Sequence, residues 1–370
     1  MAQFDVVFEG GGAKGSAFVG ALTALKAAGH TTRRLIGTSA GAITATLLAV
    51  GYTPEGMLDA VNEKLNGKPR FATFMDHPRP ADFSQPQKDV SDTMRALELV
   101  HIPMFAGHLL LNMLLETPLY PTLFSVVECG GVFAGVAFLN WMQEKLLVRG
   151  VLATDTLASV FAKTQVDLSV VASDTSDMEM LVLNHRTAPN VPIASAVRMS
   201  MSIPLVWREM VWQESWGPYL GRSKTGNVIV DGGVLSNFPI RLIDESVPEI
   251  MGDTDPDGAL NLGLLLDETL AIPGTNPGKP PLSLQEMRVV QRLSRLMDTM
   301  MGAQDNEEMR QHASEICRLP VKGYGTTEFD MPDPRLQALV DAGRAAVEAH
   351  LQSRNLAQAS STARSSAGQP

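Results

Sequence analysis

The sequence is poor in cysteine and has no cluster of soft metal ligands. Its 370 residues include two cysteines, Cys129 and Cys317, and no cysteine or histidine group with zinc-binding spacing. Nothing therefore requires a disulfide or a metal, and we expect free thiols in a reducing, cytoplasmic setting. Residues 1–8 are too short and polar for a signal sequence, although export by another route stays open.

Basic residues are scarce as well. The chain has 30 Lys and Arg against 40 Asp and Glu, a formal net charge of −10, and no basic cluster offsets this excess. Nucleic-acid phosphates would be repelled, so we expect no nucleic-acid partner. The same charge argues against binding to anionic membranes through a broad basic face.

Long apolar runs are also missing. The longest candidate, residues 99–115, is interrupted by His101, Pro103, Gly107, His108 and Asn112, so we do not predict a transmembrane helix. We favour buried packing in a helical cap, because Met and Leu stripes usually belong to a core. A lid or a lipid-facing surface is the alternative. The tryptophans of the loop before Asp231 leave a similar choice between covering a core and facing a bilayer: Trp207, Trp212 and Trp216.

The first fifty residues do contain a clear order. Residues 4–8 and 33–36 are β-prone, and each run is followed by a glycine-containing turn and a helical run, residues 16–28 and 42–50. This repetition predicts a parallel α/β layer with functional loops at the carboxyl ends of its strands. Further elements are predicted as strands at residues 166–173, 178–183, 227–230 and 260–266 and as a long helix at residues 284–318.

A serine lies on the second of these turns. The sequence Gly37-Thr38-Ser39-Ala40-Gly41 fits G-x-S-x-G, in which a sharp strand-to-helix turn presents the serine hydroxyl. Gly37 and Gly41 would permit the turn and leave room for substrate. The following helix would favour negative charge at its N-terminus. An ordinary tight turn is the alternative for this motif taken alone.

The first turn is glycine-rich: Gly10-Gly11-Gly12-Ala13-Lys14-Gly15. It lacks the Lys-Ser/Thr of a nucleotide-binding P-loop and the acidic residue that a dinucleotide site places after the next strand. We therefore predict an oxyanion hole formed by the backbone of Gly10, Gly11 and Gly12, chiefly the N–H groups of Gly11 and Gly12. Lys14 either attracts a phosphate headgroup or is a solvated lysine in the first helical turn.

A carboxylate is the best candidate for the base. Asp231 ends the strand at residues 227–230 and precedes Gly232 and Gly233, so it could accept the serine proton directly. An Asp-Gly turn without function is the alternative. Only His312 and His350 follow Asp231, and neither is predicted to lie on a loop after a strand, so a triad is poorly supported.

Together these motifs resemble the patatin-like phospholipase family, with the glycine-rich loop, the serine elbow and the Asp-Gly-Gly motif in that order. The resemblance implies a three-layer α/β/α fold with a mostly parallel central sheet and an inserted helical cap. We assign residues 4–330 to this domain, with about 70–122 as the cap. A C-terminal helix at residues 331–352 and a disordered tail at 353–370 are expected from composition.

The resemblance also implies a reaction. Ser39 would attack a glycerolipid ester, Asp231 would take the proton, and water would release the fatty acid, with no metal or cofactor. The implied protein is a phospholipase A or lysophospholipase, with Lys14, Gly15, Gly37, Gly41, Gly232 and Gly233 as supporting residues. A neutral-lipid or general esterase and a catalytically idle lipid-binding module stay as alternatives. Peripheral membrane contact and the oligomeric state are left open.

Overall fold

A central sheet forms the body of the protein. The computed structural model describes residues 1–117, 119–243, 247–252, 258–273, 299, 306–326 and 328–366. The sheet has eight strands, with β7 (Glu179–Leu183) paired to β6 outside the main order. That order is β12 (Ile316–Pro320), β11 (Leu260–Asp267), β1 (Gln3–Phe8), β2 (Thr31–Thr38), β6 (Asp167–Asp174), β10 (Val228–Asp231) and β9 (Met210–Val211).

The direction of the strands follows the chain connections. Neighbours from β12 to β6 are parallel, because helices connect the successive strands β1, β2 and β6. β7 and β10 each pair with β6 in the antiparallel direction. The sheet is therefore mostly parallel, as predicted.

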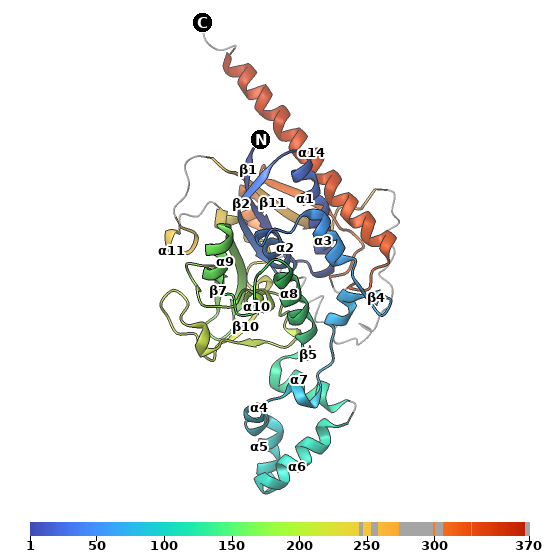
Figure 1. Cartoon of the computed structure of the whole chain (residues 1–370), viewed down its shortest axis with the longest axis vertical. Coiled ribbons are helices and arrows are strands. Elements are labelled where there is room, and N and C mark those ends of the chain that lie inside the picture. The colour runs from blue at the N-terminus through green and yellow to red at the C-terminus, as the bar shows by residue number, and fades with distance from the viewer. Residues whose placement is uncertain are drawn as a thin grey trace.

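Helices cover both faces of this sheet (Figure 1). Val6 and Phe8 of β1 pack into the larger apolar cluster, whereas Val7 between them packs into a separate cluster on the other face. Both faces are therefore buried, and the predicted three-layer α/β/α fold is confirmed. The helices of the body are α1 (Ala17–Ala27), α2 (Ala40–Ala49), α3 (Pro54–Val61), α8 (Val136–Val148), α9 (Leu157–Thr164), α10 (Ile193–Ser200), α11 (Pro248–Met251), α13 (Asn306–Gln311) and α14 (Asp333–Ser366).

The C-terminal helix packs closely against α1. A Cβ added at Gly20 would lie 1.8 Å from the Val340 carbonyl oxygen, and one at Gly343 would lie 2.0 Å from the Ala17 carbonyl oxygen. These two glycines let the helix backbones approach. The helix α14 continues to Ser366, well past its predicted end at residue 352. Residues 353–366, which the sequence analysis expects to be a disordered tail, are described as part of this helix.

A second difference concerns the long helix predicted at residues 284–318. Most of this segment lies outside the described residues. Within its described part, the chain forms α13 and then the strand β12, which pairs with β11. The predicted helix is therefore wrong at its C-terminal end, where Ile316 and Cys317 are buried at the sheet edge.

A helical lobe projects from one end of the body (Figure 1). We use "lobe" for residues 85–129, which form α4 (Gln85–Asp89), α5 (Asp92–Leu99), α6 (Met104–Leu115) and α7 (Tyr120–Cys129). The chain returns to the body through β5 (Gly131–Phe133), which pairs with β8 (Leu205–Trp207), and a small hairpin of β3 (Lys64–Leu65) and β4 (Lys68–Pro69) precedes the lobe. The lobe begins and ends later than the cap predicted at residues 70–122.

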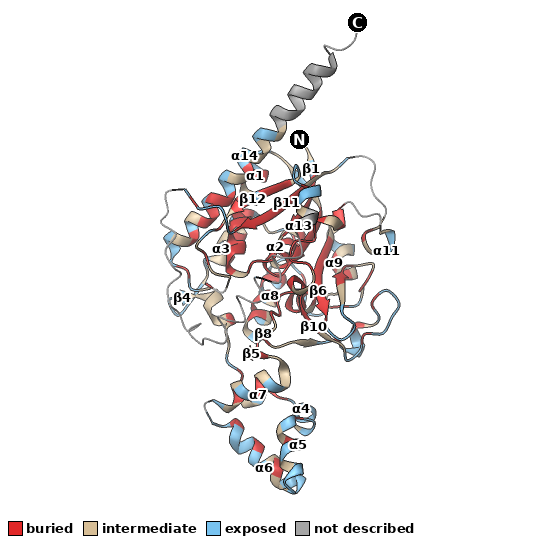
Figure 2. Ribbon diagram, turned by 180° about the vertical axis from the view of Figure 1, so that it is seen from behind, coloured by how far each residue is buried: buried red, intermediate tan, exposed pale blue. Residues whose placement is uncertain are grey.

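Most of the apolar stretch at residues 99–115 is exposed rather than buried. The lobe has a small core of its own, which includes Leu111 and Leu115 of α6. Most other large apolar side chains of α6 lie at the surface. In Figure 2, the ribbon of the lobe is mostly in the colours of exposed and intermediate residues. Buried cap packing therefore accounts for one face of α6 only. By contrast, the three loop tryptophans Trp207, Trp212 and Trp216 are buried and cover the core of the body.

No single helix among the described residues is long and apolar enough to cross a bilayer. The segments Gln85–Leu99 and Met104–Leu115 reach the required length and hydropathy only when taken together, and they are bent by 114° at the break between them.

Candidate active site

Ser39 lies on a strained turn between β2 and α2. Its φ of 51° and ψ of −117° are unfavourable for a residue with a side chain, so the surrounding structure must hold this conformation. A Cβ added at Gly37 would lie 2.3 Å from the Gly41 carbonyl oxygen, and one at Gly41 would lie 2.3 Å from the Phe8 carbonyl oxygen. Both glycines are therefore required for the close packing of this elbow, as predicted for a nucleophile turn.

A serine that the sequence analysis did not single out holds the elbow in place. The Ser39 N–H donates to Ser200 Oγ at 2.9 Å, and Ser200 Oγ donates to the Val171 carbonyl oxygen at 2.5 Å. Ser200 ends helix α10, whereas Val171 lies in β6. The Ser39 turn is thus tied to the next strand of the sheet through a buried hydroxyl.

Asp231 lies at the same height along the sheet as the end of β2, where Ser39 follows. Thr38, which precedes the serine, pairs with Val171 of β6, and Asp231 pairs with the following residue, Ala172, from the opposite side of β6. A Cβ added at Gly232 would lie 2.4 Å from the Val171 carbonyl oxygen and 3.1 Å from Thr38 Cγ2. Because Gly232 has no side chain, the turn that follows Asp231 can pack closely against β6 and against Thr38 at the end of β2.

Burial controls the charge of Asp231. The residue is 1% exposed, and its Oδ1 accepts a hydrogen bond from the Gly233 N–H at 2.8 Å. Burial raises the pKa of the carboxyl to about 7, while the Gly233 N–H and the nearby Ser39 hydroxyl oppose this rise. Oδ2 has no hydrogen-bond partner of ordinary geometry among the described residues. One carboxylate oxygen is therefore left to accept a proton near neutral pH.

The glycine-rich loop lies directly beside Ser39. A Cβ added at Gly10 would lie 3.3 Å from Ser39 Cβ. The Gly10 N–H already donates to the Asn237 carbonyl oxygen at 2.9 Å, so it is not free to bind an oxyanion, in contrast to our prediction for this residue. The N–H groups of Gly11 and Gly12 make no hydrogen bond to any described residue. These two groups are the candidate oxyanion donors.

Side chains on either side brace this loop. Asn237 Nδ2 donates to Glu9 Oε1 at 3.0 Å and to the Gly10 carbonyl oxygen at 3.2 Å. Lys14 is 5% exposed and forms an ion pair with Glu268, so it is not the solvated lysine of the first helical turn that the sequence left as one alternative. A Cβ added at Gly15 would lie 2.7 Å from Ala40 Cβ, which shows how closely the loop packs against α2.

A narrow apolar cavity of about 40 Å³ adjoins the elbow and the glycine-rich loop. Gly12, Gly15, Ser16 and Ala40 form the part of its wall nearest to these features. The remaining lining is almost entirely apolar and comes from α1, α2, α3, α8 and the segment before the lobe: Val19, Ile43, Thr44, Leu47, Met57, Val61, Phe71 and Trp141. Ser39 is not part of the lining, but the cavity begins at the residue that follows it, Ala40, and is walled mostly by apolar side chains.

The two histidines that follow Asp231 in the chain, His312 and His350, contact residues outside the Ser39 site. His312 Nδ1 lies 3.0 Å from Glu315 Oε2, close to the start of β12. His350 lies on α14, where burial and then Arg354 lower its pKa. Asp231, by contrast, is placed against the strand of Ser39, and the carboxylate stays the candidate base.

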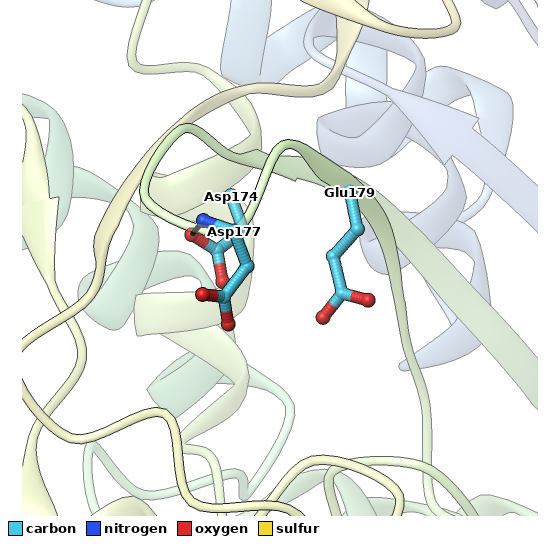
Figure 3. A group of neighbouring side chains, drawn as sticks. All are labelled: Asp174, Asp177 and Glu179. Atoms are coloured by element: carbon cyan, nitrogen blue, oxygen red, sulfur yellow. Dashed lines mark hydrogen bonds between the residues drawn. The ribbon is translucent and has the colours of Figure 1, made fainter.

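One group of carboxylates among the described residues has the spacing of a metal site. Asp174, Asp177 and Glu179 have oxygens within 4.8 Å of one another, and Figure 3 shows Glu179 opposite the two aspartates. The Lys224 ammonium already lies among them, 3.0 Å from Asp174 Oδ2, 2.6 Å from Asp177 Oδ2 and in contact with Glu179. Burial lowers the pKa of Lys224, but its three carboxylate partners raise it further, above its usual value. This ammonium takes the place of a cation.

We expect Lys224→Met to destabilise the fold by about 3 kcal/mol, because it leaves the fully buried Asp174 without its counter-charge. Chemical denaturation of the purified variant measures this loss. Lys163→Met is the matched control, since Lys163 is 45% exposed and pairs with a single aspartate. It should cost about 1 kcal/mol or less. Equal losses in the two variants would show that the Lys224 cluster is no more than a surface ion pair.

The mostly parallel sheet covered by helices on both faces, and the strained serine elbow after its central strand β2, define an α/β/α protein with a G-x-S-x-G turn. A comparison with known families gives the same answer: the model described as "Patatin-like phospholipase" matches residues 6–244, well over half of the chain. The chain therefore belongs to the patatin-like phospholipase family. The family resemblance inferred from the three motifs is confirmed, and the protein is a lipid acyl hydrolase.

Two relatives are similar along much of the chain. The protein YqhO of Bacillus subtilis, described as uncharacterized, is 28% identical over 357 residues, which cover 94% of this chain and 97% of YqhO. The probable lipid hydrolase 463L of Invertebrate iridescent virus 6 is 22% identical over 235 residues, 64% of this chain and 61% of that protein.

Two solved bacterial structures are similar at lower identity. VipD from Legionella pneumophila is 18% identical with a TM-score of 0.43, over 95% of this chain and 67% of VipD. The type III effector ExoU, found in Pseudomonas aeruginosa, is 17% identical with a TM-score of 0.43. The match covers 96% of this chain and about half, 53%, of ExoU.

Proposed function

We propose that the protein is a phospholipase A or lysophospholipase that works with a Ser39–Asp231 dyad. The observation that carries this proposal is the position of Asp231, buried against the strand of Ser39 with one oxygen unpartnered and a pKa of about 7. A carboxylate with this pKa is half ionised at neutral pH. It can therefore both accept a proton from the serine and return it to a leaving group.

The reaction would proceed through an acyl-enzyme. As Ser39 Oγ attacks the ester carbonyl carbon, its proton passes to Asp231, and the carbonyl oxygen becomes an oxyanion near the Gly11 and Gly12 N–H groups. Collapse breaks the bond to the lipid alcohol, which takes the proton from Asp231. Water then attacks the acyl-enzyme, with Asp231 again accepting and returning the proton. The products are a fatty acid and a lysolipid or deacylated headgroup.

The apolar cavity supports an acyl-lipid substrate. It adjoins Ala40 and Gly12, where the acyl carbonyl must lie, and it continues between apolar side chains of α1, α2 and α3. Its volume of about 40 Å³ is far below that of ordinary ligand pockets, so lining side chains must move when a fatty chain enters. We propose that this cavity holds the acyl chain of the substrate.

Lipid profiling tests the proposed substrate class. The wild-type protein and its Ser39→Ala variant are incubated separately with phosphatidylcholine, lysophosphatidylcholine and triacylglycerol. We expect wild type, but not Ser39→Ala, to release fatty acid from one or both phospholipids. Hydrolysis restricted to triacylglycerol or to soluble esters would instead support the esterase alternative, and no serine-dependent hydrolysis would support an idle lipid-binding module.

A change at Ile43 tests the proposed acyl cavity. Ile43 lies on α2 one turn after Ser39, with its N–H bonded to the Ser39 carbonyl oxygen, and it lines the cavity. Ile43→Phe should lower kcat/KM for a sixteen-carbon ester by about tenfold or more relative to a four-carbon ester, because the larger ring fills the space. Kinetics on the ester series measure this ratio.

The matched control is Leu48→Phe. This residue lies on the same helix but packs against the core without lining the cavity. Its ratio of long-chain to short-chain activity should stay within about twofold of wild type. If both variants leave the ratio unchanged, the acyl chain lies elsewhere.

A further inference from the structure

Helix α6 has two opposite apolar faces, of which the lobe covers one. Gly107, Leu111 and Leu115 recur every four residues and are buried in the lobe. At 100° per residue, Phe105, Leu109 and Met113 lie on the opposite face. Their side chains are 85%, 58% and 63% exposed. A helix that is apolar all round normally has a partner on every side, so this outer face is missing one.

Other exposed apolar side chains lie at the start of α6 and in the segments that flank it. Leu99 and Val100, at the end of α5 and in the turn that follows it, are 81% and 65% exposed, and Met104 is 62% exposed. Leu119 and Leu123, at the start of α7, are 83% and 57% exposed. No other part of the described chain gathers so many exposed large apolar residues within one short segment.

The charges of the lobe indicate which kind of surface this face fits. Residues 99–115 contain no Asp, Glu, Lys or Arg. The whole lobe has two cationic side chains, Lys88 and Arg95, against five carboxylates, a formal charge of −3. An anionic bilayer would repel this lobe, and the apolar face has no cation to bind anionic headgroups. A zwitterionic bilayer has no net charge to oppose insertion of the apolar side chains.

The lobe is also connected to the proposed acyl cavity. Phe71, which lines the cavity, packs on Phe74 with ring centroids 5.0 Å apart, and the Phe74 carbonyl oxygen accepts a hydrogen bond from Trp207 Nε1 at 2.9 Å. The next residue, Arg208, donates to Ser125 Oγ in the lobe at 2.9 Å and to the Asp82 carbonyl oxygen at 3.1 Å. The lobe is therefore fixed to the wall of the cavity by specific contacts.

From these observations we propose that the outer face of α6, formed by Phe105, Leu109 and Met113, docks the enzyme on zwitterionic phospholipid bilayers. The lobe would insert these side chains below the headgroups while its contacts with the body hold the cavity near the lipid surface. This inference rests on the proposed function, since it supplies the surface from which a phospholipid substrate would be drawn.

Vesicle binding tests this docking surface. Flotation with phosphatidylcholine vesicles is measured in the Ser39→Ala background, so that no lipid is consumed. We expect Phe105→Glu/Leu109→Glu/Met113→Glu to weaken binding by at least about tenfold, because charged side chains oppose insertion while glutamate still supports a helix. The matched control adds the same charge at three exposed apolar positions of the body: Leu147→Glu/Val148→Glu/Leu152→Glu, at residues 59%, 73% and 53% exposed.

The control should bind within about twofold of the parent protein. Replacing half of the phosphatidylcholine by phosphatidylglycerol should weaken binding of the parent. A Phe105→Trp variant gives an independent signal, because the four native tryptophans are buried: its emission should shift to the blue when phosphatidylcholine vesicles are added. Unchanged binding of the α6 variant, no blue shift or preference for the anionic vesicles would overturn the proposal.

Two further outcomes are distinguishable. If light scattering shows that the parent is a dimer which the α6 variant dissociates, with vesicle binding unchanged, the face binds a second copy of the chain and the proposal fails. Activity on a soluble short-chain ester, measured with Ser39 intact, should be equal in the α6 variant and wild type. If the parent protein binds vesicles through α6 but wild type hydrolyses no phospholipid, docking stands and the proposed function fails.

Discussion

Ser39→Ala should abolish both covalent labelling by a fluorophosphonate probe and ester hydrolysis, with a loss in kcat of at least about 10⁴-fold. The strained elbow presents a single hydroxyl beside the glycine-rich loop, and no other serine occupies such a turn within the described chain. Alanine removes the nucleophile but keeps the backbone bond to Ser200, since that bond uses the Ser39 N–H. The variant should therefore fold normally.

Ser236→Ala provides the matched control. Ser236 is buried in the segment after Asp231, and its hydroxyl has no hydrogen-bond partner among the described residues. Its backbone N–H donates to the Gly232 carbonyl oxygen, and its carbonyl oxygen accepts from Thr38 Oγ1. Removal of this hydroxyl should leave labelling intact and activity within a few-fold of wild type. Labelling that persists in Ser39→Ala and disappears in Ser236→Ala would assign the nucleophile to the wrong serine.

The local parts of this site could be predicted from the sequence because each is specified by a short segment. The strand, glycine turn and helix around Ser39 lie within about twenty consecutive residues, and the glycine-rich loop has the same form. Glycine positions identify where backbones must approach closely, as Gly37 and Gly41 do. For this reason the predicted strands and the elbow agree with the structure to within a few residues.

The relation of Asp231 to Ser39 needed the tertiary structure. We expected a carboxylate at the carboxyl end of a neighbouring strand, but β10 is antiparallel to β6, and β6 separates it from β2. The two residues meet because the short β10 enters from the edge where β2 ends. Such pairing depends on contacts between residues about 190 positions apart in the chain.

Two residues that hold the elbow and the glycine-rich loop in place could not be predicted either, because their hydrogen bonds also join distant parts of the chain. Ser200 and Asn237 hydrogen-bond to backbone groups of the elbow and the glycine-rich loop, and the sequence around them does not specify these distant partners. The apolar stretch on α6 shows another limit of sequence reasoning. Its composition predicts that it is covered, but periodicity cannot tell whether a cover comes from the same chain, and the structure leaves most of this stretch exposed.

Asp231→Asn should lower kcat by at least about 10²-fold, because the amide cannot accept the serine proton. Asparagine is nearly the same size, and its oxygen can still accept the bond from the Gly233 N–H. His312→Ala and His350→Ala should each stay within a few-fold of wild type, since neither histidine has been placed beside Ser39. A histidine variant as inactive as Asp231→Asn would show that the enzyme uses a triad.

The pH dependence of activity should follow Asp231. Because burial raises the pKa of this carboxyl to about 7, kcat/KM of wild type should fall about tenfold for each pH unit below that value. The residual activity of Asp231→Asn should lack this dependence. A wild-type profile that stays flat from pH 8 down to pH 5 would exclude Asp231 as the base.

The same burial should make Asp231→Asn more stable than wild type at alkaline pH. A pKa raised from 3.8 to about 7 means that the folded state binds the proton more tightly than the unfolded chain, so wild-type stability falls as pH rises through this window. The full cost above pH 7 is about 4 kcal/mol, of which about 2 to 3 kcal/mol develops between pH 5 and 8. Asparagine carries no charge at any pH in this range. Urea denaturation at pH 5 and pH 8 should therefore show the stability advantage of the variant growing with pH, and an advantage that shrinks would mean that the ionised carboxylate is well solvated rather than buried.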